Sequence, residues 1–302
     1  MKLRFTSITA TLAALTLAGA AFAASVTGSD GFTVDAAGSE AVIVINSTVF
    51  EIMHELGLGD RIIARDGAST FPENDLTDLG HFVNWGVEGV LSLGGDLVIA
   101  GEENMTPEKA EQLRSAGLDV LVVRDTATGG LPGLYSRIEL LAEAFGLDAA
   151  GGQLIARIQQ EVEDLEVELD ALVARSDRVD ALFIYSHSVG DTTIYGGPNT
   201  GPGILLRLAG LVDAGAWVND AHVVITSEAV VTANPDVVVM LQRVYDNLGG
   251  VEGFLQLPSI ALTGAGINEA VYVTDNTVRW IGPRFPEFAR RLASDVYGLG
   301  IY

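Results

Sequence analysis

Residues 149–175 form the feature that most constrains the fold, because they make one uninterrupted amphipathic segment. Apolar residues recur in it every three or four positions, and acidic residues lie between them. This pattern predicts a single helix of about 25 residues, about 38 Å long. On both sides of it, short apolar runs alternate with helical stretches. Such alternation favours parallel sheets that are covered by helices.

We therefore expect an α/β fold of two lobes, each with a mostly parallel sheet, joined by one long helix. A mature chain of about 280 residues is too long for one comfortable core. The expected boundaries are residues 36–132 for the first lobe, 133–175 for the helical connection and 176–302 for the second lobe. A coiled-coil arm of a dimer is the alternative use of the long helix, but the pattern is short for that purpose.

Runs of Val, Ile and Leu locate the strands, and capping residues locate the helices. The predicted strands are Ala41–Ile45, Arg61–Ala64, Asp96–Ala100, Asp119–Val123, Val179–Tyr185, Asp236–Leu241 and Ala270–Thr274. The predicted helices are Val49–Leu56 capped by Ser47 or Thr48, a helix from Thr106 to Gly117, Gly203–Gly210 and Pro286–Leu299.

The first 23 residues have the pattern of a secretory signal peptide. Lys2 and Arg4 precede an apolar run, and Ala21-Phe22-Ala23 is a typical cleavage sequence. No later segment has the roughly 18 uninterrupted apolar residues that a membrane span needs. We expect an exported periplasmic protein without membrane insertion. Because the chain has no cysteine, we expect it to be free rather than lipid-anchored.

The chain is strongly acidic, with a formal charge of −23 over 302 residues, which becomes −25 once residues 1–23 are removed. Nucleic-acid binding needs Lys and Arg to neutralise phosphates, so this charge argues against it. A solvated acidic surface suited to a salty habitat is the simpler interpretation, and a cationic partner is the alternative.

A local pattern occurs twice, 140 residues apart. Glu88 begins a short predicted helix and Asp96, eight residues later, begins a buried strand; Glu228 and Asp236 repeat this arrangement. The repeat indicates two related lobes with one glutamate at an equivalent corner of each. A glutamate at a helix start also interacts favourably with the helix dipole, so the repeat has a purely structural interpretation as well.

Enzyme motifs are scarce. The chain lacks the serine-nucleophile, zinc-protease, P-loop and dinucleotide-binding motifs, and two prolines in the glycine-rich segment 196–203 remove amides that would cradle a phosphate. We expect no bound nucleotide and no catalytic site. An exported enzyme that uses Glu and His as acid and base remains an alternative.

Candidate ligand-binding groups follow predicted strands or lie in loops, where α/β lobes present such groups. His81 and His187 are candidate metal ligands, whereas His54 fits a structural role on an amphipathic helix and His222 gives no clue. Aromatic rings can form the walls of a cleft for a flat ligand, and an arginine can pair with a ligand carboxylate. The aromatic candidates are Phe71, Phe82, Trp85, Tyr185, Tyr195, Tyr245, Trp280 and Phe285. The arginine candidates are Arg243, which follows a predicted strand, and Arg279 and Arg284 on either side of Trp280.

Several motifs occur in order along the chain. They are Ser47–Ala64, Ser69-Thr-Phe-Pro72, Leu91–Ala100, Gln112–Gly117, Leu206–Gly210, Asn234-Pro-Asp236 and Gly282–Glu287. This set resembles the periplasmic binding proteins of importers for iron chelates and vitamin B12, and most of all their hemin-binding branch. The resemblance implies a class III binding-protein architecture with the ligand cleft between the lobes.

The resemblance also implies a function and partners. The expected ligand is heme or a related iron chelate, carried as cargo by a monomer to an inner-membrane ABC permease dimer with a cytoplasmic ATPase. Glu88 and Glu228 match the glutamates that meet permease arginines. Phe71 stands where hemin-binding members often carry an iron-ligating tyrosine. Therefore either His187 or His81 replaces that donor, or the cargo is a siderophore or cobalamin.

Overall fold

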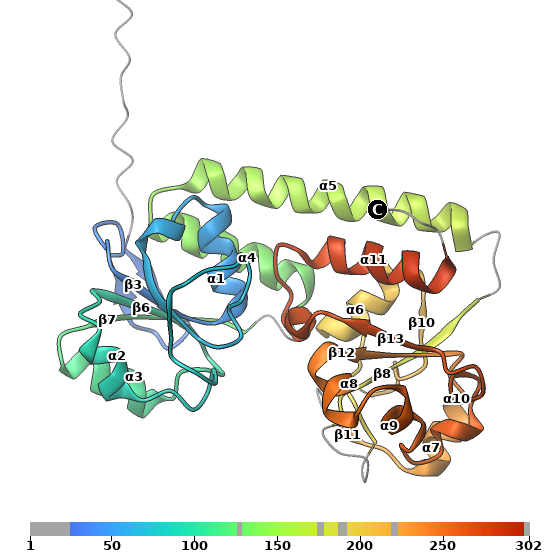
Figure 1. Cartoon of the computed structure of the whole chain (residues 1–302). Coiled ribbons are helices and arrows are strands. Elements are labelled where there is room, and N and C mark those ends of the chain that lie inside the picture. Colours follow the sequence, from blue (N-terminus) through green and yellow to red (C-terminus); the bar gives the residue numbers. More distant parts are fainter. Residues whose placement is uncertain (1–24, 126–128, 174–177, 187–191, 219–222, 299–302) are drawn as a thin grey trace, which may run out of the picture.

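The computed structural model describes residues 25–125, 129–173, 178–186, 192–218 and 223–298. Two lobes lie side by side, and one long helix runs across both of them (Figure 1). The α/β fold of two lobes joined by a helix is therefore confirmed. The predicted signal peptide, residues 1–23, lies outside the described residues.

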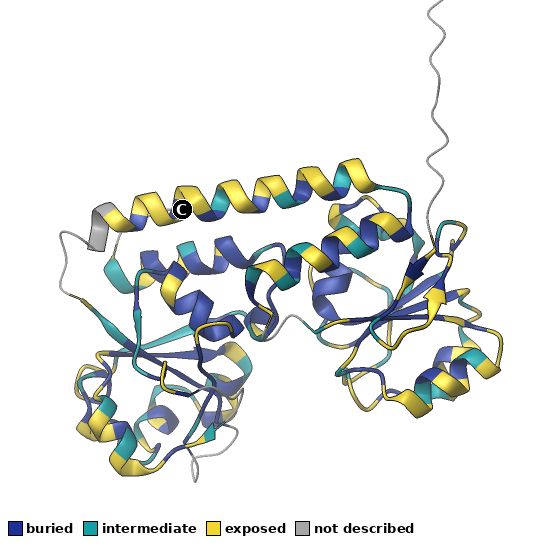
Figure 2. Ribbon diagram, turned by 180° about the vertical axis from the view of Figure 1, so that it is seen from behind, coloured by how far each residue is buried: buried dark blue, intermediate teal, exposed yellow. Residues whose placement is uncertain are grey.

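The N-terminal lobe has a five-stranded parallel sheet in the order β5-β4-β3-β6-β7. Its central strands are fully buried, since helices cover both faces (Figure 2). The strands are β3 (Val42–Ile45), β4 (Ile62–Arg65), β5 (Thr77–Asp78), β6 (Leu97–Gly101) and β7 (Asp119–Val123), and the small hairpin before them is β1 (Val26–Thr27) with β2 (Thr33–Val34). The helices are α1 (Ser47–Glu55), α2 (Val87–Ser92) and α3 (Pro107–Ser115).

The C-terminal lobe has a mixed sheet in the order β11-β9-β8-β12-β13, with β10 pairing β8. Strands β8, β10, β12 and β13 are parallel, but β9 is antiparallel to both of its neighbours, β8 and β11. The chain between β8 and β9 is too short for a parallel crossover of about a dozen residues. The strands are β8 (Asp180–Ile184), β9 (Thr193–Ile194), β10 (Val212–Asp213), β11 (Val223–Val224), β12 (Val237–Leu241) and β13 (Val271–Thr274).

Short helices surround this second sheet. They are α6 (Gly201–Leu208), α7 (Ser227–Ala233), α8 (Gln242–Leu248), α9 (Val251–Leu255), α10 (Gly264–Ile267) and α11 (Phe285–Tyr297). A 3-10 helix, η3 (Asn276–Arg279), connects β13 to the start of α11. Among the described helices, none is long and apolar enough to cross a membrane.

The long helix is α5 (Asp148–Val173), and it packs on both lobes. Its apolar stripe is buried against α4 (Gly130–Ala144) in one lobe and against α6 and α11 in the other (Figures 1 and 2). Ion pairs fasten it as well: Arg157 meets Glu55 at 2.9 Å, and Glu166 meets Arg207 at 2.7 Å. The chain's own lobes thus cover the stripe, so the coiled-coil alternative is wrong for the part described.

The repeated pattern has a clear structural meaning. Glu88 and Glu228 are each the second residue of their helices, α2 and α7. The Asp96 carboxylate accepts a hydrogen bond from the Glu40 backbone N–H at 2.9 Å, and Asp236 accepts one from the Asp180 N–H at 2.9 Å. In both lobes the aspartate therefore ties the start of one central strand to the start of its neighbour.

Two helix starts test the predicted caps. Thr106 accepts from the Lys109 backbone N–H and caps α3, as predicted. For α1 the prediction that Ser47 or Thr48 is the cap is wrong. The Asn46 side-chain oxygen accepts hydrogen bonds from the backbone N–H groups of Thr48 and Val49 instead. Asn46 sits one residue earlier, where the backbone is still extended, as a cap requires.

Candidate functional site

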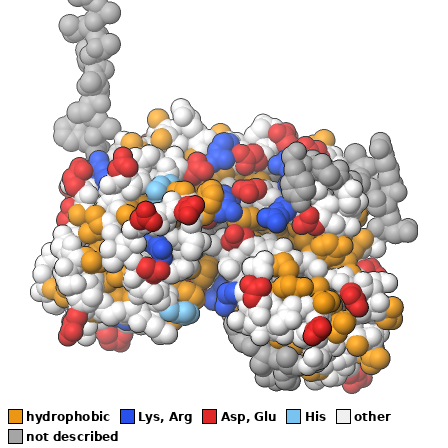
Figure 3. All heavy atoms as spheres, viewed as in Figure 1, with side chains coloured by type: hydrophobic (Ala, Val, Ile, Leu, Met, Phe, Trp, Pro, Cys, Tyr) orange, Lys and Arg blue, Asp and Glu red, His pale blue; other side chains and the backbone are white. Residues whose placement is uncertain are grey.

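The two lobes meet through residues that follow the carboxyl ends of their strands. Among the described residues, charged and aromatic contacts cross the seam between Glu103 and Arg279, between Phe82 and Trp280, and from Arg284 to both Glu51 and Phe71. The molecular surface is notched where the lobes meet, on the side away from α5 (Figure 3). Ligands of open α/β sheets bind outside the carboxyl ends of strands, so this seam is the candidate site.

A buried hydrogen-bond chain positions the N-terminal side of the seam. Arg137 on α4, with 3% of its surface exposed, donates to the Asn46 side chain at 3.1 Å. Asn46 donates to the Asn104 side chain at 3.0 Å, and Asn104 donates to the Phe82 carbonyl at 3.4 Å. Burial lowers the pKa of Arg137 to about 10, so it stays charged near neutral pH. This series of hydrogen bonds therefore links the core of the first lobe to Phe82 at the seam.

An acid–base pair lies at the centre of the seam. Arg279 at the end of η3 meets Glu103, which follows β6, with 3.3 Å between Nη2 and Oε2. Burial, followed by the negative charge of Asp125, raises the pKa of Glu103 to about 7, although Arg279 opposes this. The Glu103 carboxylate is thus close to half-ionised at neutral pH.

Two tyrosines and a second arginine lie beside this pair in the C-terminal lobe. Tyr185 follows β8, and its ring meets the Tyr195 ring edge-on with centroids 6.0 Å apart. The Arg243 guanidinium donates to the Tyr185 hydroxyl. Both tyrosine hydroxyls also interact with Arg279, and burial raises the pKa of Tyr195 to about 12. The structure therefore brings together Tyr185, Tyr195 and Arg243 of the predicted set.

A row of aromatic rings crosses the seam next to these groups. The exposed His81 ring stacks on Phe82, with centroids 4.4 Å apart, and Phe82 meets the buried Trp280 ring edge-on at 5.2 Å. Trp280 in turn lies 5.3 Å from the Arg279 guanidinium. The rings of Phe82 and Trp280 thus connect His81 to Arg279 and the tyrosines beside it. His187 and His222 lie outside the described residues.

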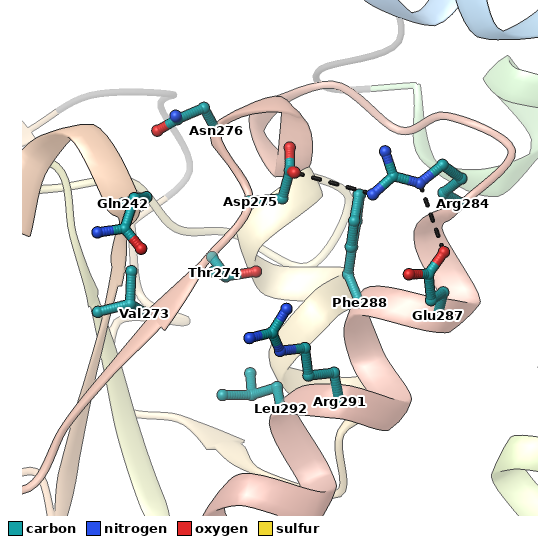
Figure 4. A pocket seen from close by; sticks show the side chains of 10 residues that line it. All are labelled: Gln242, Val273, Thr274, Asp275, Asn276, Arg284, Glu287, Phe288, Arg291 and Leu292. Carbon is teal, nitrogen blue, oxygen red and sulfur yellow. Dashed lines mark hydrogen bonds and ion pairs between the residues drawn. The ribbon is translucent and has the colours of Figure 1, made fainter. Parts of the chain in front are cut away.

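Phe71 occupies a different part of the seam. It is 47% exposed, and the Arg284 guanidinium lies 3.7 Å from the ring centroid. Arg284 is also paired with Asp275 and Glu287, and these groups line a pocket of about 240 Å³ between β13 and α11 (Figure 4). That volume is smaller than ordinary ligand pockets of about 300–1,000 Å³. No described contact joins Phe71 to His81 or to Tyr185.

Glu51 of α1 is buried at the same place. Only 4% of it is exposed, and its carboxylate lies 3.9 Å from Arg284. Burial raises the pKa of Glu51 to about 8, since desolvation outweighs the charge of Arg284. Glu51 therefore carries a proton at neutral pH and contributes a hydrogen-bonding group, rather than a full charge, to the seam.

A larger cavity is lined entirely by residues of the N-terminal lobe. It has about 860 Å³ and lies between the β1–β2 hairpin and α3, with Phe32 and Met105 among its lining residues. Across the described ranges, no group of three or more His, Asp or Glu side chains could hold a bare metal ion. A metal that arrives inside an organic chelate needs fewer protein donors.

Glu88 and Glu228 are both exposed. Their helices, α2 and α7, lie at the ends of the two lobes that are farthest from α5 (Figure 1). The two helices that carry these glutamates therefore lie on one common side of the molecule (Figure 1).

Some seam residues were not predicted from the sequence. Glu103 and Glu51 were missed, whereas Phe82 was among the aromatic candidates and does lie at the seam. Glu103 carried a usable signal, because it directly follows a buried parallel strand. Glu51 carried none, since its arginine partner lies far away in the sequence.

Two α/β lobes that meet at their strand ends, with one long helix across both, are typical of two-lobed substrate-binding proteins. The chain belongs to the periplasmic binding protein family, whose profile matches residues 42–278. It is thus a substrate-binding protein of the ABC-transporter type. This family and the relatives described below are transport proteins, not enzymes.

Among curated relatives, an uncharacterized ABC transporter substrate-binding lipoprotein of Bacillus subtilis is 29% identical over 82% of this chain and 76% of its own length. A vitamin B12-binding protein of Vibrio parahaemolyticus is 26% identical over 66% of this chain and 69% of its own. Among solved structures, the periplasmic heme-binding protein RhuT of Roseiflexus matches with a TM-score of 0.77 and 28% identity, over 86% of this chain and 99% of its own.

The heme-binding protein HmuT matches with a TM-score of 0.79 and 27% identity, over 90% of this chain and 89% of its own. These similarities confirm the family resemblance, the fold and the transport function.

Proposed function

We propose that this protein binds heme in the cleft between its lobes and delivers it to an inner-membrane ABC permease dimer that is driven by a cytoplasmic ATPase. The supporting observation is the seam itself, where aromatic rings from both lobes adjoin two arginines that suit the carboxylates of a flat apolar ligand. The 27–28% identity to heme-binding RhuT and HmuT favours this ligand.

We propose Tyr185, Tyr195, Trp280 and Arg243 as ligand-binding residues, together with Phe71 at the edge of the seam. His81 is the described candidate for an axial bond to the heme iron, because its imidazole is exposed and stacked at the seam. His187 remains the second candidate. Heme is cargo here rather than a catalytic cofactor, and we expect no bound nucleotide.

Spectroscopic titration with hemin tests the ligand. We expect the purified protein to shift the Soret band and to gain thermal stability on adding hemin, and His81→Ala to alter the bound spectrum. His54→Gln is the control and should leave the spectrum unchanged, because the His54 ring packs on Phe50 and is not part of the row formed by His81, Phe82 and Trp280. Absence of any Soret or melting shift in the wild-type protein would remove heme as the ligand.

Vitamin B12 is the second candidate ligand, supported by the similarity to a vitamin B12-binding protein. Cobalamin needs no bond from the protein to its metal, so Phe71 would serve by stacking. The same melting assay with cyanocobalamin discriminates the two. A rise in melting temperature with cobalamin alone would establish this alternative.

We also propose that Glu88 and Glu228 dock on arginines of the permease. Both are exposed and occupy equivalent helix positions, and their helices lie on one common side of the molecule. Glu88→Lys and Glu228→Lys should each abolish stimulation of the reconstituted transporter ATPase and leave ligand binding intact. Glu163→Lys, on the exposed face of α5, is the charge-matched control. Unchanged stimulation by both glutamate variants would contradict the docking scheme.

Residues 1–23 are proposed to be a cleaved signal peptide that directs the chain to the periplasm, where it acts as a monomer. Mass spectrometry of the exported protein would detect the new terminus after Ala23.

A further inference from the structure

The pair formed by Glu103 and Arg279 spans the two lobes, since Glu103 follows β6 of the first lobe and Arg279 ends η3 of the second. Among the residues that the structure describes, Glu103 is the only acidic side chain that forms an ion pair with Arg279, with 3.3 Å between the nearest atoms. Arg279 also lies against Tyr185, Tyr195 and Trp280. A ligand carboxylate that paired with Arg279 would therefore have to replace Glu103.

The pair is incompletely hydrogen-bonded. Within the described residues, the buried atoms Oε1 of Glu103 and Nε of Arg279 have no hydrogen-bond partner. A guanidinium binds a carboxylate best through two parallel hydrogen bonds, and this pair makes one long contact instead. An incoming carboxylate with free geometry could make both bonds to Arg279, whereas Glu103 makes only one.

Both side chains are reachable. The side chain of Arg279 is 20% exposed and that of Glu103 is 17% exposed, so neither is sealed in a core. Buried charges normally need a partner, because an unpaired one is costly. Glu103 therefore pairs with Arg279 when no other anion is present. Because both side chains are partly exposed, an anionic ligand can compete with Glu103 for Arg279.

We propose that Glu103 competes with the ligand's carboxylate for Arg279, and so sets both the affinity for acidic ligands and its dependence on pH. This inference rests on the proposed function, with a heme propionate as the carboxylate. Glu103 is a positioning residue, since it acts through Arg279.

The groups that face Glu103 set its charge. They are Arg279 and Trp280 from the η3 end, Asp125 after β7, Arg137 on α4 and Tyr195 after β9. With its pKa at about 7, Glu103 becomes protonated as the pH falls below 7 and then releases Arg279. Heme propionates remain ionised in this range, so wild-type affinity should rise from pH 8 to pH 6.

The test compares the hemin dissociation constants of the wild-type protein, Glu103→Gln and Glu102→Gln between pH 6 and pH 8. Glu102 is the matched control, because it is the adjacent exposed residue and loses the same charge. The wild-type constant divided by that of Glu103→Gln isolates the contribution of residue 103, because all other groups are common to the two proteins. For a pKa of about 7 this ratio should be about 10 at pH 8, about 2 at pH 7 and close to 1 at pH 6.

Glu102→Gln should give a ratio near 1 throughout, and hemin dimethyl ester, which lacks free carboxylates, should abolish the gain of Glu103→Gln. A ratio that does not change with pH, an equal effect of both variants, or a gain that persists with the ester would overturn the inference alone. Absence of hemin binding by all three proteins would overturn the proposed function and the inference with it. Melting curves establish that each variant is folded.

Discussion

Replacing Glu51 by Gln should stabilise this protein at alkaline pH and leave its stability almost unchanged at acidic pH. The carboxyl is buried in the seam, and its pKa rises from 4.5 to about 8 on folding. Below about pH 4.5 the group is protonated in both states. Between pH 4.5 and 8 the folded state retains the proton and the unfolded state loses it, so wild-type stability declines as the pH rises.

The magnitude follows from this rise in pKa. At about 1.4 kcal/mol per pH unit, the whole window corresponds to about 5 kcal/mol. Relaxation and water entry on ionisation absorb part of this free energy. We therefore expect Glu51→Gln to be about 2–4 kcal/mol more stable than wild type at pH 9 and about equal to it at pH 4.5.

Urea denaturation at both pH values measures this difference. Glu55→Gln is the control, since it removes a charge one turn along α1 at a largely exposed ion pair, and should change stability by less than about 1 kcal/mol at either pH. A Glu51→Gln variant that is less stable than wild type at pH 9 would refute the reasoning. That result would mean that the ion pair with Arg284 outweighs the cost of burying the charge.

Two further predictions concern packing, and urea denaturation measures both. Ile158→Ala in α5 should cost about 2–4 kcal/mol, because Ile158 is fully buried under the lobes, whereas the exposed Val167→Ala should change stability by less than about 0.5 kcal/mol. Gly201→Ala should prevent folding or strongly destabilise the protein, since its Cβ would lie 2.2 Å from a backbone oxygen, whereas Gly152→Ala, with open space, should gain about 0.5–1 kcal/mol.

Sequence patterns located the sheets well, because buried parallel strands are continuous runs of branched apolar residues. The predicted strand Asp119–Val123 has the bounds of β7, and the long helix was placed to within two residues at each end. The short antiparallel strand β9 was missed, since two residues carry no periodicity. The cap at Asn46 was missed because Ser47 and Thr48, which are also favourable capping residues, follow it directly.

The candidate site was only partly predictable, for a physical reason. Aromatic and arginine side chains after strands could be selected one by one, as Tyr185 and Trp280 were. The pairing of Glu103 with Arg279 joins residues 176 positions apart and depends on how the lobes are set against each other. No local pattern encodes such a contact.

Hydrogen exchange on adding hemin tests the central claim, that the ligand binds between the lobes, most directly. We expect slower amide exchange in the hemin-bound protein in segments 79–85 and 275–282, one from each side of the seam. Protection confined to one lobe, or centred on segments 28–32 and 107–115 around the separate 860 Å³ cavity, would contradict it.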